Sequence, residues 1–319
     1  MSPEGADSER FDRAIAAIDA GNAHDPNVVT VRARTGPKEI LHAELVTAWV
    51  QRLRADASEP LLLAARGHHF RRWTVPRSSA PTGRAGYLKW RKSLQEQHAL
   101  ELGALLTDAG YDADSVARVQ AIVRKEKLTT DPEVQAYEDA LCLAFLETQL
   151  TDVVARLDPV TLQNVIMRTA KKMSDTGRAA IADVPLDASA VAVLTGAFAR
   201  DVVDRYLEGL AANDWSAVSE TLAPDIERMG PYRDGYRGRE QYSKFLADTV
   251  GALDGYQLDV DRVLGTGSVV TVELRETVDD GDNRLETAEV VVFDTADGLI
   301  TKVAVYLQTS ERHPRPSAG

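Results

Sequence analysis

One short segment of the sequence carries side chains that suit acid–base, metal or phosphate chemistry. Two histidines are adjacent, His68 and His69. Three arginines and a tryptophan follow within the next eight residues: Arg71, Arg72, Trp73 and Arg77. Imidazole exchanges protons near neutral pH and binds metals, and the arginine guanidinium matches the geometry of phosphate. Few structural requirements call for this mixture, so the segment is the first candidate for a functional site.

Three further ionisable residues lie on faces of expected helices that are otherwise apolar. His42, His98 and Asp139 each stand three or four residues from leucines, valines or a cysteine. A histidine in such a place is most often a satisfied core residue, whereas a buried carboxylate is costly unless something pairs with it. If these faces converge with the histidine pair, imidazoles and a carboxylate meet in a pocket that suits Fe, Mn, Zn or Ni.

Charge is unevenly distributed along the chain. The net charge is −12, yet residues 60–95 contain eight bases and no acid. A positive region in an acidic protein favours an anionic small-molecule ligand. A solvated basic face opposite an acidic one is the alternative. The overall acidity and the few aromatic residues among these bases argue against nucleic acid as a partner.

The composition is that of a soluble globular protein. The 319 residues are 44% hydrophobic and 27% charged, and no apolar run is long enough to cross a bilayer. The N-terminus lacks the features of a signal peptide. Cys142 is the only cysteine, so no internal disulfide can form. We therefore expect a cytoplasmic protein without membrane contact.

The first domain, residues 1–185, is predicted to be all-α. Helix patterns and capping signals mark six main helices and a shorter one at the N-terminus. Their expected ranges are 11–19, 36–54, 61–70, 87–108, 113–127, 132–155 and 158–173. Residues 181–189 are predicted to form a linker.

The second domain, residues 190–312, has a different pattern. Two main helices, 198–212 and 239–253, flank a short one that begins at Asn213-Asp-Trp215. Alternating or β-branched runs then predict strands over 256–264, 268–278, 284–294 and 299–307, separated by hairpin turns. Helices followed by an antiparallel sheet predict an α+β fold.

The order of the histidines resembles the landmarks of HD-domain metal-dependent phosphohydrolases, which are all-helical. The matching pieces are His42-Ala-Glu-Leu-Val, the histidine pair, His98-Ala-Leu-Glu-Leu and Glu138-Asp139-Ala-Leu. The resemblance implies His42, the pair and Asp139 as metal ligands, with nearby bases neutralising phosphoryl charge. The chain departs from the family at His69, where the family has aspartate, and at Arg124-Lys125, where many members carry later histidines.

A second resemblance covers residues of about 10–185. Phe11-Asp-Arg-Ala-Ile, His69-Phe-Arg-Arg72-Trp73, Gly86-Tyr87-Leu-Lys-Trp90-Arg91, Val123-Arg-Lys125-Glu126 and Glu138-Asp139 resemble the bacterial family named domain of unknown function 4202. This resemblance implies no activity.

The second domain resembles the nuclear transport factor 2-like superfamily and its polyketide-cyclase, or SnoaL-like, relatives. The matching pieces are Ala199–Trp215 and Gly235–Tyr242. The resemblance implies a cone-shaped α+β fold that commonly dimerises, so we expect a homodimer through this domain. Tyr206 matches the oxyanion-binding tyrosine of the ketosteroid-isomerase branch. Gly230 stands at that branch's general-base position, which argues against isomerase chemistry.

The sequence predicts a metal-dependent enzyme, such as a hydrolase, that acts on an anionic, phosphorylated small molecule. The predicted catalytic residues are His69, Asp139, Arg72, Lys125 and Glu138. The predicted substrate-binding residues are Arg71, Arg77, Trp73, Arg91 and Tyr206. The predicted ligands of a divalent transition metal are His42, His68, His69, His98 and Asp139. Two alternatives remain open: a di-iron oxygenase, in which His68 is a ligand, and a non-catalytic binding or dimerisation protein.

Overall fold

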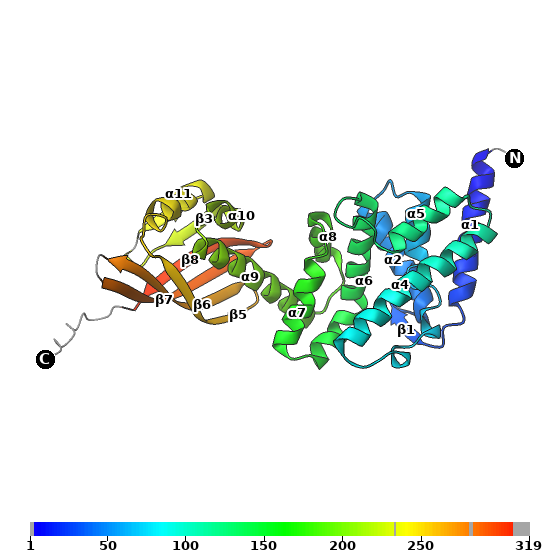
Figure 1. The fold of residues 1–319 in the computed structure, drawn as a ribbon, viewed down its shortest axis with the longest axis horizontal. Helices are drawn as coiled ribbons and strands as arrows, with labels where there is room; N and C mark the ends of the chain where they lie inside the picture. The colour runs from blue at the N-terminus through cyan, green and yellow to red at the C-terminus, as the bar shows by residue number, and fades with distance from the viewer. Residues whose placement is uncertain (1–2, 233, 281–282, 309–319) are drawn as a thin grey trace. The chain divides into compact units, whose positions relative to one another are not determined.

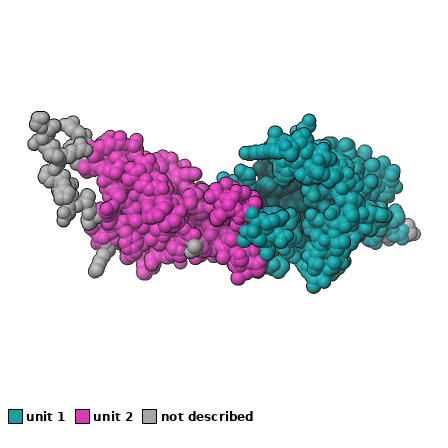
Figure 2. Space-filling model, turned by 90° about the horizontal axis from the view of Figure 1, so that it is seen from below, with its two compact units in different colours: residues 1–156, 168–186 teal, residues 157–167, 187–319 magenta. Residues whose placement is uncertain are grey.

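The computed structural model describes residues 3–232, 234–280 and 283–308. The chain forms two compact units (Figure 2). The first comprises residues 1–156 and 168–186, and the second comprises residues 157–167 and 187–319. The sequence assigned residues 157–167 to the first domain, whereas the structure places them in the second unit. None of the helices in the described part of the chain is both long and apolar enough to span a membrane.

The first unit is helical, in agreement with the predicted fold class (Figure 1). Its helices are α1 (Pro3–Asn22), α2 (Lys38–Leu53), α3 (Glu59–Arg66), α4 (Gly83–Asp108), α5 (Ala113–Val123), α6 (Pro132–Arg156) and α8 (Asp175–Ala179), and α7 (Pro159–Ala170) is divided between the units. Three 3-10 turns cover Arg72–Thr74, Arg77–Ser79 and Ala180–Asp183. A small hairpin of β1 (Val28–Val31) and β2 (Arg34–Pro37) precedes α2. This hairpin is not among the elements expected from the sequence.

The start of α2 is held by a buried carboxylate from the loop before the hairpin. Asp25 Oδ2 accepts a hydrogen bond from the backbone N–H of Glu39 at 3.0 Å, in the first turn of α2. Asp25 Oδ1 accepts from the backbone and side-chain nitrogens of Asn27 at 2.9 and 2.7 Å. Asp25 thus caps a helix whose preceding residue, Pro37, offers no capping side chain. This capping fixes the turn that carries Glu39 and His42.

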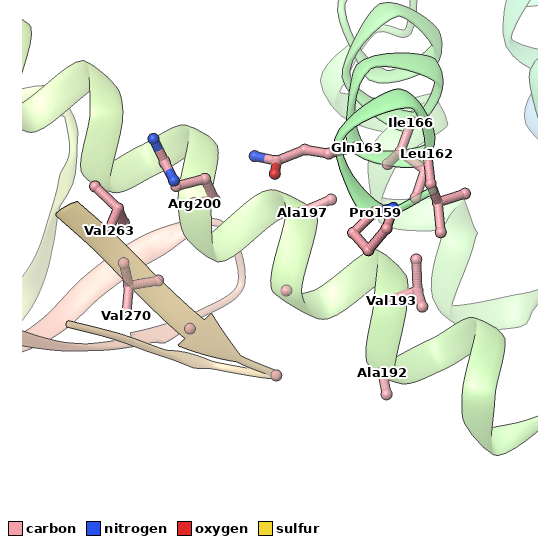
Figure 3. A pocket seen from close by; sticks show the side chains of 13 residues that line it. Pro159, Leu162, Gln163, Ile166, Ala192, Val193, Ala197, Arg200, Val263 and Val270 are labelled. Atoms are coloured by element: carbon pink, nitrogen blue, oxygen red, sulfur yellow. The ribbon is translucent and has the colours of Figure 1, made fainter. Parts of the chain in front are cut away.

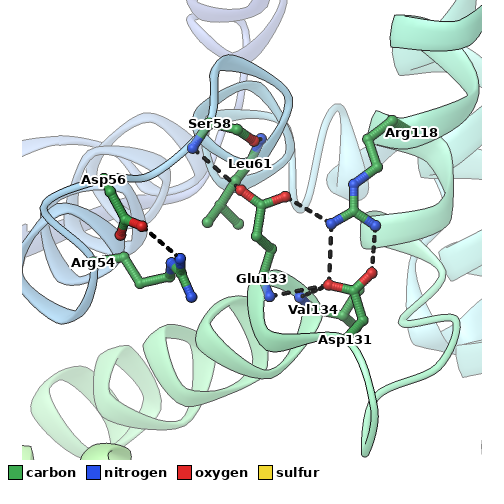
Figure 4. A network of polar contacts seen from close by, with 8 residues as sticks. All are labelled: Arg54, Asp56, Ser58, Leu61, Arg118, Asp131, Glu133 and Val134. Atoms are coloured by element: carbon green, nitrogen blue, oxygen red, sulfur yellow. Dashed lines mark hydrogen bonds and ion pairs between the residues drawn. The ribbon is translucent and has the colours of Figure 1, made fainter.

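A network of charges joins the starts of α3 and α6 to α5 (Figure 4). Arg118 on α5 donates to Asp131 and Glu133, and Glu133 accepts from the backbone N–H of Ser58 at 3.2 Å. Ser58 in turn caps α3 through the N–H of Leu61. The hydrogen bonds from Arg118 lower the pKa of Asp131 to about 2. The network aligns α3, whose C-terminal end leads into the histidine pair.

Helix α3 ends at Arg66, four residues before the predicted end, so the histidine pair lies in a turn. Gly67 packs so closely on Leu102 of α4 that an added Cβ would lie 2.5 Å from its methyl group. The ring of Phe70 packs against Gly21 of α1 in the same way. Asn22 Oδ1 then accepts from the backbone N–H of Arg71, which has a left-handed φ of 54°. These contacts hold the turn between α1 and α4.

The second unit is a six-stranded sheet covered by helices, as the α+β prediction required. Its elements are α9 (Ala188–Ala211), α10 (Trp215–Glu220), β3 (Leu222–Met229), β4 (Gly235–Arg237), α11 (Arg239–Thr249), β5 (Gln257–Thr266), β6 (Val269–Asp280), β7 (Asn283–Ala296) and β8 (Leu299–Leu307). The strand order is β4-β3-β8-β7-β6-β5, with only β3 and β8 parallel. Apolar residues of the three helices and of one sheet face form a single core.

Replacement of Asp25 by alanine should destabilise the protein by about 2 kcal/mol, because one buried cap and two further hydrogen bonds are lost. Urea unfolding of the full chain measures the change. Asp112→Ala is the matched control, because Asp112 caps α5 through the N–H of Ser115 at 2.8 Å but is exposed. We expect about 1 kcal/mol or less for the control. Equal losses in the two variants would contradict the role given to burial at Asp25.

Candidate functional site

Glu39, His68 and His69 form the one group of possible metal ligands found among the described residues. A carboxylate oxygen of Glu39 and one ring nitrogen of each histidine lie within 4.8 Å of one another. Glu39 and His68 are buried, whereas 39% of the His69 side chain is exposed. Glu39 does not stand out in the sequence, because an acid in the first turn of a helix is already explained by the helix dipole.

Backbone carbonyls fix the proton positions on two of the histidines. His68 Nδ1 lies 3.1 Å from the carbonyl of Ala65, and His98 Nδ1 lies 3.0 Å from the carbonyl of Phe70. A carbonyl oxygen can only accept, so both Nδ1 atoms carry hydrogen and both Nε2 atoms keep a lone pair. His98 Nε2 is buried and has no hydrogen-bond partner in the described part of the chain. Such lone pairs are available to a metal ion or to a proton.

Burial keeps the imidazoles neutral. It lowers the pKa of His98 to about 4 and lowers the pKa of His42 and, more strongly, of His68. Loss of hydration within the protein, and then the charge of Arg72, lowers the pKa of His69 as well. The rings of His69 and His68 are 4.3 Å apart, and those of His69 and His98 are 5.8 Å apart. The structure therefore brings together histidines from α2, α4 and the turn after α3.

Two cations border this group. The charge of Arg72 lowers the pKa of His42, His69 and His98, and its guanidinium lies 5.2 Å above the ring of Trp90. Among the described residues, no carboxylate forms an ion pair with Arg72. Lys125, which has a left-handed φ of 59°, also lowers the pKa of His69.

A buried carboxylate fixes Lys125. Its ammonium pairs with Glu138 on α6, which is 3% exposed. Lys172 contacts the other oxygen of Glu138 at 3.7 Å. The ion pair with Glu138 thus holds the Lys125 ammonium near His69.

Asp139 is not part of this group, although the sequence predicts it as a metal ligand. One of its oxygens accepts from the Ser174 hydroxyl at 2.6 Å, and the other accepts from Ser174 N at 2.9 Å and Gln135 Nε2 at 3.0 Å. Gly177 packs against the same carboxylate. Both oxygens are therefore used to hold the segment that starts α8. The group that includes His68 and His69 takes its carboxylate from Glu39 instead.

The predicted substrate-binding residues occupy different positions. Arg77 donates to the carbonyls of Ala80 and Pro81, so it holds the loop before α4. Arg71 lies 3.9 Å from Glu101. Trp73 is partly buried in the first 3-10 turn, and Arg91 is exposed on α4. Tyr206 belongs to the second unit.

The residues of this site fit a divalent transition metal. The buried Glu39 Oε2 makes no hydrogen bond in the described chain, and its contact with His69 Nδ1 is long, at 3.4 Å. A buried carboxylate oxygen without a good donor is costly, and a cation beside neutral imidazoles would remove that cost. The same groups, with Arg72, are also able to bind an anion and exchange a proton.

Comparison with known proteins identifies both units. The model of the family described as domain of unknown function (DUF4202) matches residues 12–194, which is more than half of the chain. The chain belongs to the DUF4202 family. A SnoaL-like domain matches residues 203–303. The resemblances to the DUF4202 family and to SnoaL-like proteins are thereby confirmed, whereas the resemblance to HD-domain enzymes stays a prediction. Among curated proteins, nothing matches this chain.

Solved structures resemble the second unit of this DUF4202 protein. A putative ketosteroid isomerase from Kribbella flavida is 25% identical over 37% of this chain and 84% of its own, with a TM-score of 0.33. An NTF2-like protein of unknown function from Cytophaga hutchinsonii is 18% identical over 34% and 89%, with a TM-score of 0.30. An LEH-like epoxide hydrolase from M. tuberculosis is 23% identical over 35% and 84%, with a TM-score of 0.33.

The SnoaL-like unit of this DUF4202 protein contains a second cluster of ionisable groups, some buried and some half-buried. The Tyr206 and Tyr242 hydroxyls lie 2.7 Å apart, and Tyr256 donates to Glu276 at 2.7 Å. The pairing of β6 and β7 sets Glu289 opposite Leu274, so Glu276 and Glu289 are diagonal neighbours on the core face of the sheet. Burial, and then the charge of Glu276, raises the pKa of Glu289 to about 7.

A separate groove in this unit carries no such chemistry. It has a volume of about 390 Å³ and lies among the first half of α7, α9 and the β5–β6 hairpin (Figure 3). Only two of its lining residues, Gln163 and Arg200, have polar side chains. Arg200 is paired with Asp204 on the same helix, at 2.7 Å. The groove is therefore mainly apolar.

Replacement of Asp139 by asparagine should destabilise the protein by about 1–3 kcal/mol and leave metal binding unchanged, because its oxygens hold Ser174 and Gln135. Urea unfolding and metal analysis of the purified variant measure the two effects. The conservative partner change, Ser174→Ala, should destabilise in the same direction. Loss of metal from a folded Asp139→Asn protein would restore Asp139 as a ligand.

The SnoaL-like unit should lose stability as pH rises from about 5 to 8. The pKa of Glu289 is raised above its ordinary 4.5, so the folded protein holds this proton more tightly than the unfolded chain does. The resulting stability is complete below pH 4.5 and is lost as pH passes about 7. Glu289→Gln should therefore stabilise the full chain at pH 8 by roughly 1 kcal/mol, a value reduced for partial exposure.

Calorimetric melting of wild type and variant across this pH range tests the effect. The difference in stability between the two proteins at each pH removes the contributions of the other titrating groups, which both proteins share. Glu286→Gln, an exposed change on the same strand, is the control and should give a constant difference. A Glu289→Gln difference that does not grow with pH would refute the assignment.

Proposed function

We propose that the first unit is a metal-dependent enzyme that acts on a phosphorylated small molecule. The observation that carries this proposal is the convergence of Glu39, His68 and His69, whose ligand atoms lie within 4.8 Å of one another. Neutral imidazoles and a carboxylate are the donor set that Fe, Mn, Zn and Ni accept in proteins. His42 and His98 stand beside this group and are the candidates to complete it.

A divalent metal ion held by these residues would activate water and stabilise charge on a phosphoryl group. The other tasks fall to the protein. Arg72, which has no carboxylate partner among the described residues, binds the anion and orients it over the histidines. Lys125 adds a second positive charge, and Glu138 keeps its ammonium in place. The neutral His98, whose Nε2 keeps a lone pair, is suited to accept a proton.

An oxidation at an iron centre is the second candidate function. The observation that favours it is that His68 and His69 both belong to the ligand group, whereas the HD-domain pattern has a histidine followed by an aspartate at the pair. Additional imidazole ligands suit iron in oxygen chemistry. Binding of a small anion without catalysis is the third candidate, and dimerisation through the SnoaL-like unit stays a prediction.

Replacement of Glu39 by glutamine should weaken metal binding at least about tenfold, since an amide is a poor ligand, and should abolish phosphatase activity on a panel of phosphate esters. Folding should be retained, because the Oε2 atom makes no hydrogen bond in the described chain. The measurements are elemental analysis of protein purified without chelators, and the same analysis after reconstitution with each metal.

Glu96→Gln, an exposed change on α4, is the control and should retain the metal. Stoichiometric Zn, Mn or Ni with phosphatase activity supports hydrolysis, whereas iron without it supports oxidation. Absence of metal from both the purified and the reconstituted protein would exclude both functions and leave anion binding.

A further inference from the structure

Helix α4 carries a stripe of residues that leads from the histidines toward its N-terminal end. Arg84, Tyr87, Arg91, Leu94 and His98 follow one another at spacings of three and four. In an α-helix this spacing places side chains on one face. His98 belongs to the histidine group, so Arg91, Tyr87 and Arg84 extend from the site along the helix. We call these three residues the α4 stripe.

The cations of the stripe are exposed and unneutralised. Arg84 and Arg91 are both exposed, and among the described residues neither forms an ion pair or a side-chain hydrogen bond. Other arginines of this unit are engaged, as in the pairs of Arg66 with Asp19 and of Arg124 with Glu96. No acid lies within residues 60–95 to offset the charge. The positive field along the stripe is therefore available to a ligand.

Aromatic stacking connects the stripe to Arg72. The ring of Tyr87, which is 42% exposed, lies 6.1 Å from that of Trp90. The guanidinium of Arg77 lies 5.9 Å from both rings, and that of Arg72 lies 5.2 Å from Trp90. Trp90 is 8% exposed and anchors the group to α4. The segment that carries Arg72 and Arg77 is thus held beside Tyr87 and Trp90 before any ligand binds.

The length of the stripe excludes a single phosphate as its only ligand. At 1.5 Å per residue, Arg91 lies about 10 Å and Arg84 about 21 Å along the helix from His98. One phosphate group beside His98 cannot also reach Arg84. A ligand that runs from His98 to Arg84 must carry several negative groups in a row.

We propose that the α4 stripe binds a chain of phosphate groups, of which the terminal one lies beside Arg72 and the histidines. This inference rests on the proposed function, because it makes the substrate of that site an oligophosphate compound. Arg72 holds the reacting group, and Arg91 and Arg84 hold the groups that follow. The shared chemistry is a row of phosphates, whether from inorganic polyphosphate or from an oligonucleotide.

The test compares two double variants with equal charge change on different faces of α4. Arg84→Gln with Arg91→Gln removes the stripe. Lys89→Gln with Lys92→Gln removes two exposed cations that lie on other faces of the helix and have no ion-pair partner in the described chain. The ligands are inorganic orthophosphate, tripolyphosphate, a longer polyphosphate and a single-stranded oligothymidylate. Calorimetry on the full chain, at several salt concentrations, gives the affinities.

Wild type should bind the ligands more tightly as the phosphate chain lengthens. The stripe variant should bind the long polyphosphate at least about tenfold more weakly, and its binding of orthophosphate should be unchanged. The slope of the logarithm of the binding constant against the logarithm of salt concentration should become shallower by about two. The lysine variant should keep most of the affinity. Equal losses in the two variants, or affinity that does not rise with chain length, would overturn the proposal.

Two further experiments distinguish failure of the α4 stripe from failure of the proposed metal site, and identify the source of the phosphates. The same titrations on Glu39→Gln with a chelator present should keep the length dependence, even if the metal proposal fails. If the affinity of Glu39→Gln no longer rose with the length of the phosphate chain, the proposal that the α4 stripe itself binds the chain would be overturned. Tighter binding of oligothymidylate than of polyphosphate, weakened by Tyr87→Ala, would assign the ligand to nucleic acid. The reverse order would assign it to inorganic polyphosphate.

Discussion

The hydrogen bonds from His68 and His98 to the carbonyls of Ala65 and Phe70 set the proton positions in the candidate site of the first unit. Each bond places the proton on Nδ1 and leaves a lone pair on Nε2 in a region where burial keeps the rings neutral. The carbonyls are themselves fixed by helix α3 and by the turn that Asn22 and Gly67 hold. Packing around a short turn therefore sets which ring nitrogen of His68 and of His98 carries the proton. The nearby charges of Arg72 and Lys125 only shift the pKa values of the histidines further.

The convergence of the histidines was predictable, and the identity of the carboxylate was not. His42 and His98 interrupt apolar helix faces, and this periodicity by itself indicates burial. Asp139 gave the same signal, but its partner is Ser174, and no local pattern shows which of two adjacent acids turns toward a segment 35 residues away. Glu39 gave no signal, because its position is also explained by the helix dipole. A carboxylate that stabilises a helix start and one placed to hold a metal look alike in sequence.

The second unit shows the same limit. The four long strands alternate regularly and were predicted close to their observed ranges, and the SnoaL-like match agrees with them. Strands β3 and β4 escaped prediction because β3 contains Pro224 and the three-residue β4 begins at Gly235. The pair Glu276 and Glu289 was also missed. Two glutamates in an acidic domain give no signal until strand register places them on one face.

The backbone conformation of Lys125 is unfavourable for a lysine, although its charge is part of the candidate site. Its left-handed backbone is a conformation that glycine adopts freely and that costs other residues about 1 kcal/mol. The backbone alone would therefore favour glycine here, and a search for more stable sequences would remove the lysine. Keeping a lysine there trades stability for charge. Engineering of this protein for thermal stability should leave position 125 unchanged if the site is to be preserved.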